Sequence, residues 1–233
     1  MLKISGAVLS AALVLSTFAA TAQAAMEVKV SDNLYSVTVA DQGPGDSVPI
    51  PGILQTNISQ FYFWGLNDAT ITGAGSPVLG EGALALNTLD IAVGTPTTLT
   101  VALSENDEML PTGPAYLNQQ FSLTSLSGNA TVTLTGYESN SNKLFDTTGL
   151  ATKPLSLSAV GGVTDSSAVG LFKAPYSLTE VATIVFQTCG ELDLQFTGNL
   201  AASPVPEPAS ILLFGTVLAA AGLVMRKRFV TNN

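Results

Sequence analysis

The sequence predicts an all-β exported domain, an antiparallel β-sandwich or jelly roll, between two apolar chain ends. Short stretches alternate apolar and polar residues and are rich in Thr and Val, which is typical of half-buried strands. Clusters of Gly, Pro, Asn, Asp and Ser separate these stretches. No stretch between residues 25 and 203 shows a convincing helical period. A barrel is the second architecture that fits.

Residues 1–24 have the pattern of a secretory signal peptide. Lys3 is their only charged residue, and residues 4–20 are apolar or small. Ala22 and Ala24 give the small-x-small pattern that signal peptidase cuts. We therefore predict a signal helix, export through the Sec translocon, and cleavage that leaves Ala25 first. The alternative is a single N-terminal membrane helix.

Eight stretches are predicted as strands. They are Leu34–Val39, Ala83–Leu86, Leu89–Val93, Thr97–Leu103, Phe121–Leu126, Ala130–Thr135, Val181–Phe186 and Leu192–Phe196. The predicted turns and loops are Asp41–Pro51, Gly73–Gly82, Gly94–Pro96, Ser104–Pro114 and Glu138–Asn142. By its length, the region 25–203 is one domain that is able to bury a core.

The charge of the exported domain limits its partners. The tail holds one of the 17 acids and the two chain ends hold four of the eight bases, so residues 25–203 carry 16 acids, four bases and a net charge of −12. This charge argues against nucleic acid and against anionic lipid as partners. It suits solubility outside the cell and would attract divalent cations.

Residues 204–233 form a separate tail. Its segment 209–225 has 17 residues without a charge, the short end of what spans a bilayer as a helix. Three cations follow at once and resist translocation: Arg226, Lys227 and Arg228. We predict one C-terminal transmembrane helix with its basic end in the cytoplasm. The alternative is a buried helix of a soluble core.

The order Pro-Glu-Pro, apolar span and basic cluster resembles the PEP-CTERM sorting tail of Gram-negative bacteria, also called the ice-binding-protein C-terminal domain. The motif residues are Val205, Pro206, Glu207 and Pro208. The resemblance implies cleavage near this motif by an exosortase, a membrane-embedded cysteine transpeptidase. It also implies an inner-membrane precursor that ends at the cell surface or in the extracellular matrix, often in bacteria that make extracellular polysaccharide.

The residue inventory excludes most familiar catalysis. The chain has no histidine, which removes Ser-His-Asp triads and histidine-ligated metals. Cys189 is the only cysteine, so no internal disulfide forms. We expect Cys189 to be buried, because it ends the apolar run 184–189, and an intermolecular disulfide is the alternative.

Two kinds of site remain as alternatives to a plain surface protein. Glu191 and Asp193 are two residues apart on a predicted strand, so they share a face, as the carboxylates of a carboxylate-dependent hydrolase of polysaccharide would. A calcium-stabilised module is the other alternative. Its expected ligands are Glu105, Asn106, Asp107 and Glu108, although a solvated turn is favoured there.

The densest aromatic cluster is residues 61–64. Alternation places Tyr62 and Trp64 on one face, where they would form a stacking platform for sugar rings. A strand buried on both faces is the favoured alternative. We therefore predict a non-enzymatic surface or matrix protein, without a cofactor, that is structural, adhesive or in contact with extracellular polysaccharide.

Overall fold

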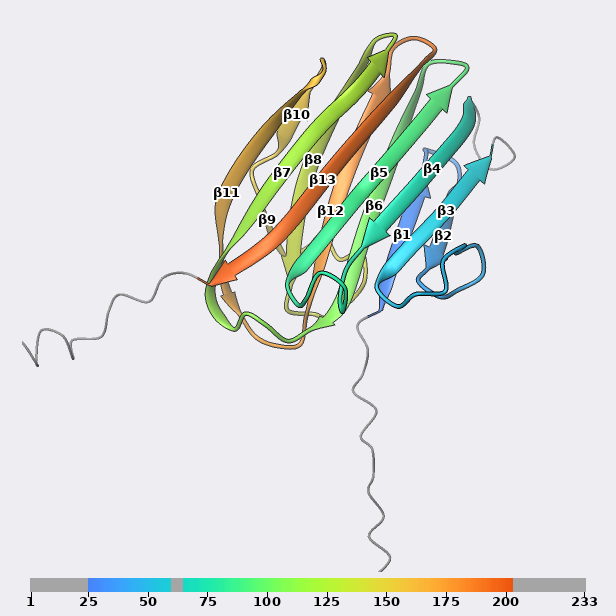
Figure 1. The fold of residues 1–233 in the computed structure, drawn as a ribbon. Coiled ribbons are helices and arrows are strands. Elements are labelled where there is room, and N and C mark those ends of the chain that lie inside the picture. Colours follow the sequence, from blue (N-terminus) through green and yellow to red (C-terminus); the bar gives the residue numbers. More distant parts are fainter. Residues whose placement is uncertain (1–24, 60–64, 203–233) are drawn as a thin grey trace, which may run out of the picture.

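The structure is a computed structural model that describes residues 25–59 and 65–202. These residues form two antiparallel sheets packed face to face (Figure 1). The all-β sandwich is therefore confirmed, and the two sheets do not close into one barrel. The described residues include no helix that could cross a membrane, and the predicted signal helix and the span at 209–225 lie outside them.

Thirteen strands make up the sheets in the described part of the chain. They are β1 Met26–Ser31, β2 Ser36–Ala40, β3 Ile53–Ser59, β4 Leu66–Ala74, β5 Ala83–Val93, β6 Thr97–Glu108, β7 Gly113–Ser127, β8 Ala130–Ser139, β9 Leu150–Ala151, β10 Leu155–Leu157, β11 Gly161–Phe172, β12 Tyr176–Phe186 and β13 Gly190–Ala202.

The strand order is that of a jelly roll with added edge strands. One sheet, called sheet A, runs β10-β8-β12-β6-β1-β2, with β9 also beside β8. The other, sheet B, runs β11-β7-β13-β5-β4-β3. From β5 to β13 the chain crosses between the sheets at nearly every turn, so neighbouring strands come from distant parts of the sequence.

Period-two alternation sets which side chains enter the core. On β13, Leu192, Leu194 and Phe196 are buried, while Glu191 is exposed on the outer face. The predicted strands are confirmed by this pattern, and the two predicted between residues 83 and 93 form the single strand β5. Six strands had no prediction: β1, β3, β4, β9, β10 and β11.

Two predictions about local structure are wrong. Ser104–Pro114 is not a loop, because β6 continues to Glu108 and β7 begins at Gly113. The carboxyl groups of Glu105 and Glu108 turn into the sandwich and accept hydrogen bonds from backbone amides there, so a polar segment stays in the strand. Cys189 is exposed rather than buried, because it lies in the turn between β12 and β13, three residues after Phe186, the last buried residue of β12.

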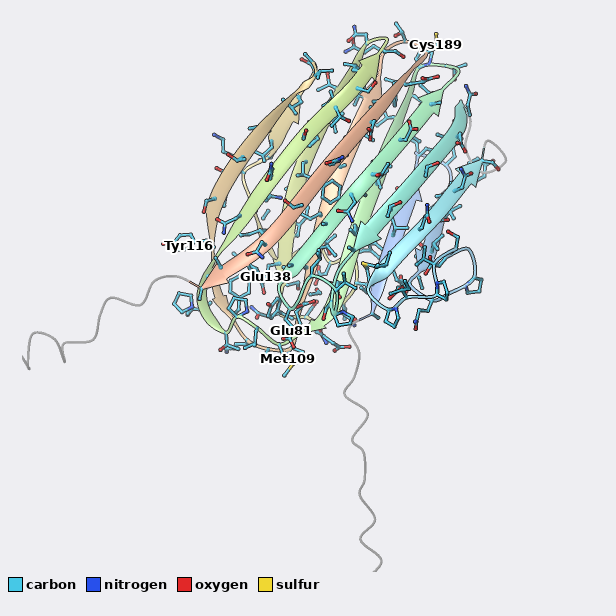
Figure 2. The ribbon with its side chains drawn as sticks, in the orientation of Figure 1. Glu81, Met109, Tyr116, Glu138 and Cys189 are labelled. Atoms are coloured by element: carbon cyan, nitrogen blue, oxygen red, sulfur yellow. The ribbon has the colours of Figure 1, made fainter. Side chains whose placement is uncertain are left out.

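The two ends of the sandwich differ in the loops and chain ends that lie there. Five connections gather at one end: 41–52, 75–82, 109–112, 140–149 and 173–175. The chain also enters at Ala25 and leaves at Ala202 on this side (Figure 1). We call it the tail-proximal end. Cys189 lies at the opposite end, and Glu81 and Met109 lie at the tail-proximal end (Figure 2).

Candidate functional site

The candidate site is an open groove on the outer face of sheet B, with a volume of about 580 Å³. Neighbouring strands β11, β7 and β13 build it. Six exposed side chains line it with amides and hydroxyls: Asn118, Gln120, Thr164, Ser166, Thr197 and Asn199. The groove is therefore polar, and among the described residues the only charged side chain that lines it is Asp165, which accepts a hydrogen bond from the Ser167 hydroxyl.

Strand register places these side chains in two rows across the sheet. Asn118 of β7 lies opposite Ser166 of β11 and Asn199 of β13. One step along the same face, Gln120 lies between Thr164 and Thr197. Residues two apart on a strand point to the same side, so both rows face solvent together.

Much of the hydrogen-bonding capacity of the groove faces solvent. The Ser166 hydroxyl donates to Asn118 Oδ1 at 2.7 Å, and this bond does not use the amide donors of the exposed Asn118 side chain. Amide and hydroxyl groups both donate and accept hydrogen bonds, as sugar hydroxyls do. The arrangement therefore matches a neutral polyhydroxylated ligand better than a charged one.

An aromatic side chain stands next to the groove. Tyr116 precedes Asn118 by two residues on β7, is partly exposed, and pairs with Ala201. Figure 2 shows Tyr116 at the edge of the sandwich near the end of β13. A tyrosine ring beside polar groups is suited to stacking on the apolar face of a sugar ring.

An acidic region occupies another part of the same outer face. Asp90 of β5 lies directly opposite Asp193 of β13. Loss of solvation raises the pKa of Asp90, and nearby Asp193, Glu191 and Asp68 raise it further. Glu191 and Asp193 do share a face, as predicted, but they lie on the open sheet and outside the groove.

The four expected calcium ligands are not brought together. Glu105 and Glu108 are fully buried in the interior. Asn106 Oδ1 accepts from the Ala25 amide at 3.1 Å, and Asp107 Oδ1 accepts from Asn142 Nδ2 at 2.6 Å. Within residues 25–59 and 65–202, no three acidic or cysteine side chains form a group that could hold a metal ion. Calcium binding therefore stays a prediction from the sequence, and no such group of ligands in the described residues supports it.

Glu105 and Glu108 instead form a buried carboxyl pair. Glu105 Oε1 accepts from the Ser76 amide at 2.7 Å, and Glu108 accepts from the Gly82 amide. Glu105 Oε2 and Glu108 Oε1 have no partner when both groups are ionised, but one proton lets the two carboxyl groups bond to each other. Burial raises the pKa of both, and the proximity of Glu108 adds to the rise for Glu105.

Two further glutamates are buried between the sheets. Gln119 Nε2 of sheet B donates to Glu180 Oε2 of sheet A at 2.6 Å. Burial raises the pKa of Glu180 to about 8, although this bond lowers it. Burial alone raises the pKa of Glu138 to about 7. These groups are enclosed between the sheets, so they are placed for structure rather than for contact with a ligand.

Other predicted site residues lie outside the described residues. They are Tyr62, Trp64, the sorting residues Val205, Pro206, Glu207 and Pro208, the basic residues Arg226, Lys227 and Arg228, and the signal residues Ala22 and Ala24. Ala25 is the first described residue. The groove residues were not predicted from sequence, because exposed Asn, Gln, Ser and Thr occur on most outer sheet faces. The one signal was the polar run Asn118–Gln120 before a predicted strand.

Comparison with known proteins supports the predicted sorting tail and does not assign a function to the β-sandwich. No curated protein sequence matches the chain. The solved structure of TmCBM61 in complex with beta-1,4-galactotriose is similar over 56% of this chain and 87% of that chain, with 10% identity and a TM-score of 0.31. A likeness of that size carries no argument about function.

The family comparison concerns the end of the chain. The model of the PEP-CTERM protein-sorting motif matches residues 204–228. These residues contain the Pro-Glu-Pro motif at 206–208, the apolar segment 209–225 and the basic cluster that follows. The match indicates an exported protein that an exosortase sorts. The chain therefore carries a PEP-CTERM protein-sorting motif at residues 204–228.

Proposed function

We propose that this protein is a non-enzymatic component of the cell surface or extracellular matrix, whose sandwich contacts neutral polysaccharide through the groove on sheet B. The single observation that supports contact is the pair of amide and hydroxyl rows centred on Asn118 and Gln120. Tyr116 beside them adds a stacking surface.

The export route is the second part of the proposal. The signal peptide sends the chain through the Sec translocon, and the segment 209–225 holds the precursor in the inner membrane. An exosortase then cuts near Pro206–Pro208 and releases the domain to the surface. The matched motif supports this order of events. The intact mass of protein recovered from cells tests it: loss of the residues beyond about Pro206 is expected, and a full-length C-terminus would contradict processing.

The absence of catalysis is also proposed rather than established. The chain lacks histidine, and the carboxylates Glu191 and Asp193 lie on an open face instead of flanking a groove. We expect no release of reducing ends from any polysaccharide that the protein binds. Release that stops in Glu191→Gln would favour the hydrolase instead.

The binding test compares variants of the groove with a variant of the same face. Protein recovered from cells is run through native gels that contain neutral polysaccharides, and retardation gives the affinity. Asn118→Ala with Asn199→Ala removes facing amides of one row, so we expect affinity to fall about tenfold or more. Asn57→Ala on β3 removes an exposed amide from the far edge of the sheet and is the matched control.

The tyrosine is tested separately. Tyr116→Ala removes the ring, and we expect weaker retention, whereas Tyr116→Phe keeps the ring and most of the binding. Equal loss in both would mean that the hydroxyl, not stacking, makes the contact. Absence of retention on every polysaccharide, including the matrix of the producing cells, would overturn the carbohydrate contact altogether.

A further inference from the structure

Three loops at the tail-proximal end carry exposed aliphatic side chains. Ile50 lies in loop 41–52, Val78 and Leu79 in loop 75–82, and Met109 and Leu110 in loop 109–112. Each of the five is between 43% and 59% exposed. Exposed apolar groups gathered at one place mark contact sites for proteins or membranes.

Hydrogen bonds donated by backbone amides hold these loops side by side. The Gly75 amide donates to Gly52 O at 3.0 Å, which joins loop 75–82 to loop 41–52. The Met109 amide donates to Glu81 Oε2 at 2.9 Å, which joins loop 75–82 to loop 109–112. The five side chains therefore belong to one continuous surface of loops, which we call the apolar loop end.

The same loops lie beside the point where the tail leaves the domain. The Leu200 amide donates to Gly82 O at 2.7 Å, so the middle loop is bonded to β13 two residues before the strand ends at Ala202. Only six residues, 203–208, separate Ala202 from the apolar segment 209–225. Six residues reach at most about 20 Å when fully extended. While the tail is attached, this end must stay close to the bilayer.

The charges near these loops do not oppose such contact. In loop 41–52, Asp46 accepts from the Gln42 and Val48 amides, and Asp41 accepts from the Gly52 amide. Glu81, which is exposed in loop 75–82, accepts from the Met109 amide, so all three carboxylates bind backbone amides of the loops. Lys143 and Lys173 are exposed in the neighbouring loops of this end, where cations suit lipid phosphates.

We propose that the apolar loop end rests on the lipid surface while the tail is in place, with Ile50, Val78, Leu79, Met109 and Leu110 at the headgroup boundary. Partial burial of aliphatic groups at that boundary is the interaction of interfacial membrane segments. The contact sets the orientation of the precursor, with the groove facing sideways and Cys189 farthest from the membrane. It rests on the proposed anchoring of the tail, and release by the exosortase frees this end.

The test uses the full chain, with its tail, in phosphatidylcholine vesicles. An environment-sensitive dye on the native Cys189 reports the far end. In a Cys189→Ser background, Val78→Cys or Leu110→Cys places the dye at the loop end. We expect the loop dyes to shift to the blue and to be quenched by nitroxide lipids, while the dye on Cys189 stays in water.

A second variant separates contact from simple tethering. Met109→Ser with Leu110→Ser removes two aliphatic groups, and the Val78→Cys dye should then be quenched no more than the dye on Cys189. The matched control is Leu34→Ser with Tyr35→Ser, which removes exposed apolar groups at the opposite end, where Leu34 is 77% exposed, and should change nothing. Circular dichroism confirms that both variants are folded.

The other results each overturn the proposal. If the chain floats with the vesicles but a loop dye is as exposed to water as the dye on Cys189, the tail is anchored and the loops do not contact lipid. If Met109→Ser with Leu110→Ser leaves the quenching of the Val78→Cys dye unchanged, tethering by the tail alone explains why the loops are close to the membrane. Dye protection that depends on protein concentration and not on lipid assigns the loops to a second copy. A chain that does not float removes the anchor, and the contact with it.

Discussion

The two halves of the sandwich interior are built from different chemistry. In the half away from the tail, the described inward side chains are apolar apart from Thr56 of β3, and Val132, Ile184 and Leu99 lie there in one cross-strand row. In the tail-proximal half, glutamates take such places. The buried polar side chains there include four glutamates and one glutamine: Glu105, Glu108, Glu138, Glu180 and Gln119. The same fold therefore closes over an apolar core at one end and over carboxyl groups at the other.

Because of this difference, the acids buried in the tail-proximal half must be protonated. No basic group contributes to the pKa of any of these four glutamates, and burial is the largest cause of each rise. An ionised carboxylate without a cation is costly in such a place, whereas a neutral carboxyl group that donates and accepts hydrogen bonds is tolerated. The polar half is therefore built for protonated acids, and the apolar half is indifferent to pH.

The largest expected effect is a loss of stability as pH rises. Burial raises the folded-state pKa of Glu180 to about 8, above its ordinary value of 4.5. Below that ordinary value both states hold the proton, so the full stability is present. Between the two values the unfolded chain releases the proton first, and stability falls by about 1.4 kcal/mol per pH unit for this one group. Urea unfolding from pH 4.5 to 9 measures the slope.

A pair of variants assigns this slope to the interior. Glu180→Gln removes the titrating group and keeps an amide that is able to bond Gln119, so the profile should flatten through pH 5–8. Glu191→Gln changes a glutamate on the outer face and should leave the slope as it is. A domain that is most stable near pH 8 and unfolds in acid would contradict the neutral state of these acids.

The apolar half gives the next largest effect, and that effect should not depend on pH. Ile184 is fully buried. Ile184→Ala deletes three carbon atoms from a close-packed row and should lower the free energy of unfolding by about 2–5 kcal/mol at both pH 5 and pH 8. A cost that differs between these two pH values would mean that the two halves are coupled, and would weaken the contrast between them.

Glycines make the room that the buried acids occupy, and this gives a smaller effect. A Cβ on Gly198 would overlap Glu180 Oε1, and one on Gly136 would lie 2.5 Å from Gln119 Nε2. We expect Gly198→Ala to cost about 1–3 kcal/mol, because a strand on one sheet must move away from the other. Gly162→Ala is the control, since its nearest neighbour would be Phe121 O at 3.6 Å. Equal melting temperatures for the two variants would contradict this packing.

The contrast also explains which strands could be predicted. Val181–Phe186 and Ala130–Thr135 lie in β12 and β8 at the apolar half, where alternation is plain. Glu105–Glu108 was interpreted as a turn, because three acids in four residues are typical of solvent. Their burial depends on the Ser76 and Gly82 amides, which approach from a loop more than 20 residues away in the chain. A local pattern does not contain that information.

The groove was hidden for a related reason. Its two rows exist because β11 pairs with β7 and β13 pairs with β7, and β11 was not predicted as a strand at all. The run Gly161–Ser167 is rich in Gly, Ser and Thr, which is typical of a loop as well as of an exposed edge strand. By contrast, the sorting motif needs no tertiary pairing, because its parts are consecutive at 204–228, and sequence alone identified it.

The smallest expected effect concerns the turn that joins β12 to β13 at the apolar end. Cys189 is exposed there, and Phe186 is the last residue of β12 that packs into the core. Cys189→Ser should therefore change the free energy of unfolding by less than about 0.5 kcal/mol, as is usual for surface positions. It should also abolish any disulfide-linked dimer on a non-reducing gel. A larger loss would show that the thiol packs into the core after all, and that the apolar half extends beyond Phe186 into the turn.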